Sequence, residues 1–164
     1  MATKVYSAIE TPVTFTDSTG DVAITLANLA ASTGMRVSVQ KDRGAGSLPQ
    51  EHDVQVNMAF ETTPVFGECV KVYIAASDGT QEDGQVGAAD AAVASAYQLQ
   101  NMMFVGALKV DVQTADTLMT ATFHGVPITT RYYSVVVHNG AVDNLQNDAN
   151  ISSVVVTPTP MESQ

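Results

Sequence analysis

Residues 54–61 read Val-Gln-Val-Asn-Met-Ala-Phe-Glu, and this stretch decides the fold class of the chain. Large apolar side chains stand at every even position, while polar or small side chains stand at the odd positions. Successive side chains of a β-strand point to opposite faces, so a period of two predicts a strand with one buried face. Residues 54–61 are therefore expected to form a half-buried strand.

The same alternation recurs along the whole chain of 164 residues. We expect strands at residues 22–26, 35–40, 54–61, 70–74, 104–112, 118–123, 131–138 and 151–157. Turn-forming residues separate them, and Asn139-Gly140 is typical of a tight hairpin turn. The pattern predicts an all-β fold: a single-domain antiparallel β-sandwich of jelly-roll-like type with about eight strands.

Two segments are less regular than the strands. Residues 88–98 are rich in alanine, which favours a short helix capped near Asp90, but a long surface loop explains the same composition. Residues 41–50 contain two glycines and a proline and are expected to form a flexible loop. In the strand at 104–112, we expect Leu108, Val110 and Val112 to face the core.

The ends of the chain differ from its centre. We divide the sequence into an N-terminal extended segment at 1–16, a β-sandwich domain at 17–157 and a C-terminal extended tail at 158–164. Proline lacks the N–H that a sheet ladder needs, so the tail is not expected to continue a central strand. The residues expected to contact a partner are Val5, Tyr6, Ile9, Pro12, Pro158, Pro160 and Met161.

The charge of the chain limits its partners. It has 7 Lys and Arg against 17 Asp and Glu, for a net charge of −10. Nucleic acids and anionic membranes attract basic surfaces, so neither is expected as a partner. No apolar run approaches the roughly 20 residues of a membrane helix, and the N-terminus does not resemble a secretory signal. One cysteine excludes an internal disulfide framework, and we expect a soluble protein made in a cytoplasm.

The sequence contains no recognisable catalytic motif. His52, His124 and His138 are far apart and show no metal-ligand spacing, and neither a Gly-x-Ser-x-Gly nucleophile elbow nor a phosphate-binding loop occurs. We therefore expect no enzymatic activity, no cofactor and no metal. One alternative stays open at residues 78–90, where Asp78, Glu82, Asp83 and Asp90 are close enough in sequence to form a calcium site. The fixed ligand spacing of an EF-hand loop is missing, however, and an acidic loop is usually a solvated surface.

Four stretches carry a resemblance to a known group of proteins. They read VYIAASDGT at 72–80, LQNMMFVGAL at 99–108, ITTRYYSVVVHN at 128–139 and VVVTP at 154–158. Together they resemble small β-sandwich virion structural proteins of tailed bacteriophages, most of all a head decoration (cement) protein. The resemblance implies a homo-oligomer, with a trimer favoured, that binds the major capsid protein on the capsid surface of a virion assembled in a bacterial cytoplasm.

Other functions fit the same sequence. A tail, baseplate or head-fibre module of a virion is one alternative, and a non-viral lectin-like sandwich is another. A tail receptor binder more often shows repeats or a fibrous segment, and the chain has neither. Arg131 opens a strand, and we expect it to pair with an acidic side chain within the fold.

Overall fold

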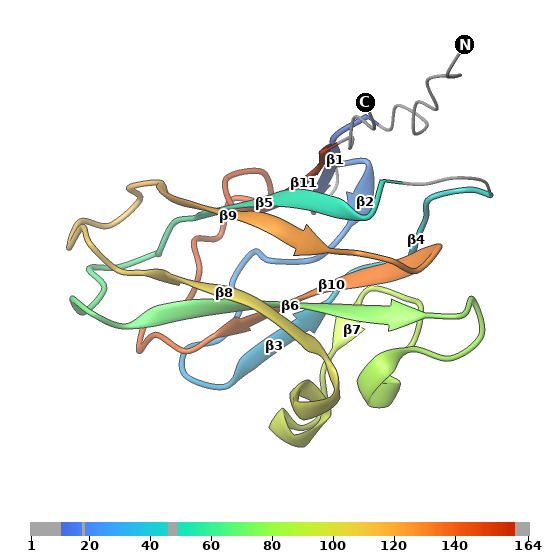
Figure 1. The fold of residues 1–164 in the computed structure, drawn as a ribbon. Coiled ribbons are helices and arrows are strands. Elements are labelled where there is room, and N and C mark those ends of the chain that lie inside the picture. Colours follow the sequence, from blue (N-terminus) through green and yellow to red (C-terminus); the bar gives the residue numbers. More distant parts are fainter. Residues whose placement is uncertain (1–10, 18, 46–48, 160–164) are drawn as a thin grey trace, which may run out of the picture.

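The computed structural model describes residues 11–17, 19–45 and 49–159, and it consists of two β-sheets packed face to face (Figure 1). The strands are β1 (Val13–Thr16), β2 (Val22–Ala23), β3 (Gly34–Val37), β4 (Lys41–Asp42), β5 (Glu51–Met58), β6 (Cys69–Ser77), β7 (Ala91–Ala92), β8 (Met103–Lys109), β9 (Met119–Pro127), β10 (Tyr132–Asn139) and β11 (Ser153–Thr159). Two short 3₁₀ helices, η1 (Asp83–Gln85) and η2 (Ala96–Asn101), lie between β6 and β8. The all-β sandwich expected from the alternation is confirmed.

The strand order places most sequence neighbours in different sheets. One sheet has the order β2-β1-β11-β5-β9, and the other has the order β7-β3-β10-β6-β8, with β4 also pairing with β10. Pairing between the described strands is antiparallel except for the parallel pair β1–β2. Most connections therefore cross from one sheet to the other at an end of the sandwich.

The main core lies between the two sheets. Val54, Val56 and Met58 are fully buried, which confirms the facing expected for residues 54–58. Across the interface, the rings of Phe15 and Tyr133 lie 5.8 Å apart between their centroids. Burial of these apolar side chains on one face of each sheet is the main force that holds the two sheets together.

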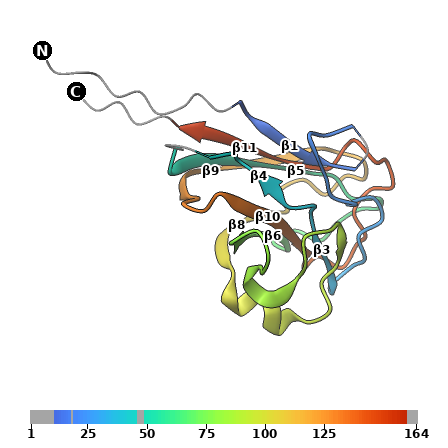
Figure 2. The same ribbon diagram turned by 90° about the vertical axis from the view of Figure 1, so that its right-hand side faces the viewer.

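A second, smaller core covers the outer face of the β10 sheet. Its buried members are Val37, Ala75, Val93, Leu99, Met102 and Val136. The segment that carries η1 and η2 lies over this face as a third layer (Figure 2). As a result β10 is buried on both sides, and Val135, Val136 and Val137 are all inaccessible to solvent.

The alanine-rich segment is neither the helix capped near Asp90 nor a plain loop. Ala91 and Ala92 form β7 and pair with β3, and Val93 packs into the second core. The helical turn begins later, where the Ser95 hydroxyl accepts a hydrogen bond from the backbone N–H of Tyr97. Packing against the sheet decides this segment, because an extended backbone lets it complete the sheet and bury Val93.

The strand count of about eight falls short of the eleven strands in the described residues. The three strands that were not expected are β1, β4 and β7, and the last two have only two residues each. β1 lies inside the segment 1–16 expected to be extended, and its pairing with β11 makes it part of the sheet. Short strands carry too few alternating positions to stand out from the flanking turns.

The strand β11 continues through Pro158, although we expected the tail to leave the sheet there. Pro158 lies opposite His52 of β5, while β1 begins at Val13, opposite Val156. Pro158 lies beyond the last described pair between β11 and β1. At this residue β11 therefore has a partner strand on one side only, which is β5. A proline is tolerated at such a position because no neighbour needs its missing N–H.

Two further expectations are wrong. Val112 is 37% exposed, because β8 ends at Lys109 and the chain turns toward the other sheet. Asn139-Gly140 forms no hairpin, since β10 pairs with β3 and β6 while the next strand, β11, lies in the opposite sheet. Asn139 is instead fully buried and holds the start of that connection.

Candidate functional site

Three connections leave the same end of the sandwich. They span residues 59–68, 110–118 and 140–152, and each one crosses between the two sheets. The first two extend to the left in Figure 1. This end of the molecule is called the loop end below.

The loop end carries most of the exposed large apolar side chains. Of eight such residues in the described part of the chain, five belong to these three connections: Val65, Phe66, Val112, Leu118 and Val142. We call these five residues the loop-end surface. Phe66 is 67% exposed, which makes it the most exposed phenylalanine among the described residues. Because the connections that carry them leave the sandwich at the same end, these side chains are candidates for a surface that contacts another molecule.

Hydrogen bonds fix the three connections to one another and to the sandwich. The backbone N–H of Gly67 donates to the carbonyl of Val110 over 3.1 Å. The N–H of Val142 donates to a carboxylate oxygen of Glu68 over 2.9 Å. These contacts hold the loop-end surface in one arrangement, which lowers the entropy that binding a partner would cost.

Buried Asn139 anchors the third connection. Its Nδ2 donates to the carbonyls of Leu29 and Asp143, and its Oδ1 accepts from the N–H of Ala141. All three distances lie between 2.8 and 3.1 Å. A single side chain therefore satisfies three backbone groups where the chain leaves β10 for the opposite sheet.

The three connections are also uniformly acidic. Their carboxylates are Glu61, Glu68, Asp111, Asp116, Asp143 and Asp148, and their sequences contain no Lys or Arg. The connections themselves therefore carry only negative charges, although Lys109 at the end of β8 lies next to them. Negatively charged surfaces repel one another and attract basic side chains.

The terminal contact residues expected from the sequence lie elsewhere. Pro12 is exposed, and Pro158 is half-buried and lines a cavity of about 240 Å³ with Val13, His52 and Tyr133. This cavity is at the opposite end of the strands from the loop end. The other expected contacts lie outside the described residues: Val5, Tyr6, Ile9, Pro160 and Met161.

Residues 41–50 were expected to form a flexible loop, but their described part is held by hydrogen bonds to the rest of the fold. Its first two residues form β4, and the Arg43 guanidinium donates to the carbonyls of Ile128 and Thr130. Arg131 donates to both carboxylate oxygens of Asp42 over 2.8 Å, and these hydrogen bonds lower the pKa of Asp42 to about 2. The structural role expected for Arg131 is confirmed.

The acidic residues of segment 78–90 do not converge on one point. The Asp78 carboxylate accepts hydrogen bonds from the N–H groups of Thr80 and Gln81, which lower its pKa. Asp83 accepts from the N–H of Ala76. Within the described residues, no three His, Cys, Asp or Glu side chains are grouped to hold a metal ion.

Glu82 is buried within the fold. Its Oε1 accepts from the Ser134 hydroxyl over 2.8 Å and from the Gln40 amide over 2.9 Å. Its Oε2 has no hydrogen-bond partner among the described residues. Burial raises the pKa of this carboxyl group, and the two hydrogen bonds only partly oppose that shift.

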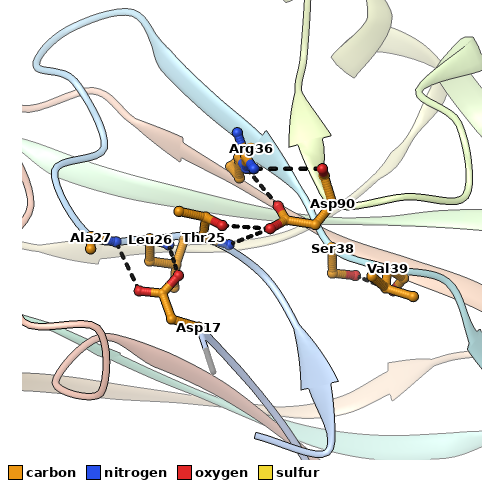
Figure 3. Close-up of polar contacts among 8 residues, drawn as sticks. All are labelled: Asp17, Thr25, Leu26, Ala27, Arg36, Ser38, Val39 and Asp90. Carbon is orange, nitrogen blue, oxygen red and sulfur yellow. Dashed lines mark hydrogen bonds and ion pairs between the residues drawn. The ribbon is translucent and has the colours of Figure 1, made fainter. Parts of the chain in front are cut away.

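Asp90 joins three segments on the outer side of the fold (Figure 3). Its carboxylate accepts from the guanidinium of Arg36 on β3 and from the hydroxyl and N–H of Thr25. Burial alone would raise the pKa of Asp90, but these contacts outweigh it and lower the pKa. In the same view, Asp17 accepts from the N–H groups of Leu26 and Ala27. These carboxylates have structural partners.

His52 and His124 lie on the paired strands β5 and β9, whereas His138 lies in the other sheet. His52 is buried on β5, whereas His124 is exposed on β9 with its Nδ1 3.0 Å from a carboxylate oxygen of Asp53. His138 is half-buried on β10, and burial lowers its pKa.

Comparison with known proteins gave no match, either to a protein-family model or to a curated protein sequence. Among the described residues, no helix has the length and apolar character needed to cross a membrane. The candidate site therefore rests on the geometry of the chain itself. Sequence reasoning missed the loop-end surface, although Val65-Phe66 beside Gly67 was a visible signal: large apolar residues in a segment with turn composition.

Proposed function

We propose that the chain is a non-enzymatic structural protein of a tailed-bacteriophage virion, namely a head decoration protein that binds the outer surface of the major capsid protein. The observation that carries the proposal is the loop-end surface. It places five exposed apolar side chains at one end of a rigid sandwich, on connections that hold one another in place.

The strand order supports the same class of protein. The eight strands of four residues or more follow the orders β1-β11-β5-β9 and β3-β10-β6-β8. This arrangement favours the jelly-roll type, a double-sheet architecture that recurs in viral capsid domains and in lectins. A fold does not define a function, so the argument depends on the surface that the fold displays.

The chemistry of the loop end suits attachment to a repeated lattice. Phe66 and its apolar neighbours would be buried in a contact of about 800 Å² on each side, a typical size for a specific interface. The carboxylates around them would face basic residues of the shell and keep unassembled copies apart. A trimer would bind through several such contacts at once, so a modest affinity at each contact gives stable occupancy.

The test uses particles of a phage that carries this gene. Purified tagged protein is added to particles from which the gene has been deleted, and the particles are imaged by electron cryomicroscopy. We expect stoichiometric density on the head. Phe66→Asp should abolish it, whereas Tyr97→Asp, an exposed aromatic residue on η2, should not.

Several outcomes would contradict the proposal. Density confined to the tail would favour the tail or baseplate alternative, and particles without added density would exclude a virion role of this kind. Sedimentation at high concentration checks the oligomer separately, because a strict monomer contradicts the trimer.

A further inference from the structure

A second surface lies on the outer face of the β10 sheet, beside η2. It is a groove of about 470 Å³ between β6, β8 and η2. The lining residues used below are Lys71, Tyr73, Gln100, Phe104 and His138. Small-molecule sites in proteins have volumes of roughly 300–1,000 Å³ and combine an apolar wall with a few polar groups.

Two aromatic rings form the apolar wall. Tyr73 on β6 and Phe104 on β8 are partners in the strand register, with ring centroids 5.3 Å apart and planes inclined by 57°. Aromatic residues make up only 6% of the chain, and Phe104 is one of the few with an exposed side chain, at 53%. The exposed part of the Phe104 side chain offers an apolar surface against which the apolar side of a flat ligand can pack.

The polar groups of the groove are cationic or neutral. Lys71 lies opposite His138 in the β6–β10 register, and no ion pair joins Lys71 to another described residue. No Asp or Glu lines the groove, although the chain carries a net charge of −10. An unpaired ammonium group beside an aromatic wall is complementary to a ligand that carries a carboxylate.

The position of the groove on a sheet face restricts the ligand further. The strand β6 pairs with β10 on one side and with β8 on the other, so it offers no free backbone edge to a peptide strand. On the face of β6, recognition therefore comes from side chains, and of the described strands beside the groove only β8, the outer strand of the sheet, has an unpaired edge. A ring with one apolar face and several hydroxyl groups uses the aromatic wall together with the exposed Gln100 amide.

We propose that this groove binds a carboxylate-bearing saccharide. A uronic acid ring packs against Phe104 and Tyr73, its carboxylate faces Lys71, and the Gln100 amide forms hydrogen bonds with its hydroxyl groups. The inference does not depend on the proposed virion role, and its test uses the isolated protein.

The experiment titrates ¹⁵N-labelled full-length protein with a galacturonic acid trisaccharide and, separately, with maltotriose as the uncharged comparator. We expect shifts of amide signals from residues 71–73 and 99–104, and weaker binding of maltotriose. Phe104→Ala should weaken binding about tenfold or more, because the stacking face is lost. Lys71→Gln should remove the preference for the charged sugar and its dependence on salt.

Phe66→Ala is the matched control, since Phe66 is a similarly exposed phenylalanine outside the groove, and it should bind as the unmodified chain does. The proposal is overturned if neither sugar shifts the groove signals at about 10 mM, a concentration that detects even weak sites. It is also overturned if Phe104→Ala and Lys71→Gln, with unchanged spectra elsewhere, bind both sugars normally. Failure here would leave the loop-end proposal intact.

Discussion

The ring of Phe123 on β9 lies directly against Gly106 on β8, in the opposite sheet. A Cβ atom added at residue 106 would stand 2.1 Å from Cε1 of Phe123, far inside van der Waals contact. The missing side chain at Gly106 thus lets the Phe123 ring approach β8 this closely. A glycine is needed here because of the space taken by the ring.

This contact predicts that Gly106→Ala destabilises the protein. The added methyl group forces the Phe123 ring or the strand to move, which typically costs about 1–3 kcal/mol. Urea unfolding of Gly106→Ala, Phe123→Leu and the double variant measures the effect. The double variant should lose less stability than the sum of the two single variants. Additive losses would contradict the contact.

Replacement of Asn139 should lower the free energy of unfolding. Asn139→Ala leaves two carbonyls and one N–H without their partner inside the protein, so we expect a loss of about 2–4 kcal/mol. The free energy of unfolding from urea titration measures it. Asn101→Ala, at an exposed position, should change stability by less than about 0.5 kcal/mol. Equal effects at both positions would refute the anchoring role.

The buried Glu82 should make stability depend on pH. Its folded pKa is raised, so the native state holds the proton more tightly than the unfolded state does. Stability should therefore fall as the pH rises from the ordinary glutamate pKa through the raised folded pKa, and stay lower above it. Glu82→Gln should remove this part of the slope. Unfolding curves measured across this pH range test this. The control is Glu61→Gln at an exposed position, where stability should depend on pH as in the unmodified chain.

Asp90 should make stability depend on pH in the opposite direction to Glu82. Its folded pKa is lowered, so its contribution is present above the ordinary aspartate pKa and is lost as the pH falls through the folded pKa. Asp90→Asn should cost about 1–3 kcal/mol at neutral pH, because hydrogen bonds from Arg36 and Thr25 to a charged group are lost. Urea unfolding measures the free energy of unfolding of Asp90→Asn and of the unmodified chain at neutral and at acidic pH. The difference between the two should be smaller at acidic pH. Exposed Asp111→Asn serves as the control, and an equal loss there would contradict the assignment.

Phe66 should be dispensable for folding. Its side chain is mostly exposed, so Phe66→Ser is expected to change the free energy of unfolding by less than about 0.5 kcal/mol. Thermal and urea unfolding check this directly. A large loss of stability would mean that the loop-end surface belongs to the core and is not free to bind a partner.

Much of the fold could be predicted because its signal is local. The even positions from Val54 to Phe60 are all fully buried, and Val22, Ile24 and Leu26 are buried as expected although only the first lies in a strand. The side chains of neighbouring residues alternate between faces wherever the backbone is extended, whatever the strand pairs with. Val112 departs from the pattern because the strand ends before it, and alternation does not mark strand ends.

The candidate site could not be predicted in the same way. Phe66 and Val142 are 76 positions apart in sequence, and the chain brings them to one end only because β5 and β10 both finish there. The terminal prolines were expected to make contacts because extended, proline-containing segments often do so. The structure directs attention to the opposite end.

The sequence by itself determined the all-β class, the positions of the long strands and the acidic character of the chain, because these follow from the order and type of neighbouring residues. Only the tertiary structure decided the order of the strands, the second core that buries both faces of β10 and the dispersal of the acidic segment among separate partners. It also decided the gathering of exposed apolar residues at the loop end. These features depend on contacts between distant segments, and no local period encodes which sheet a strand will join.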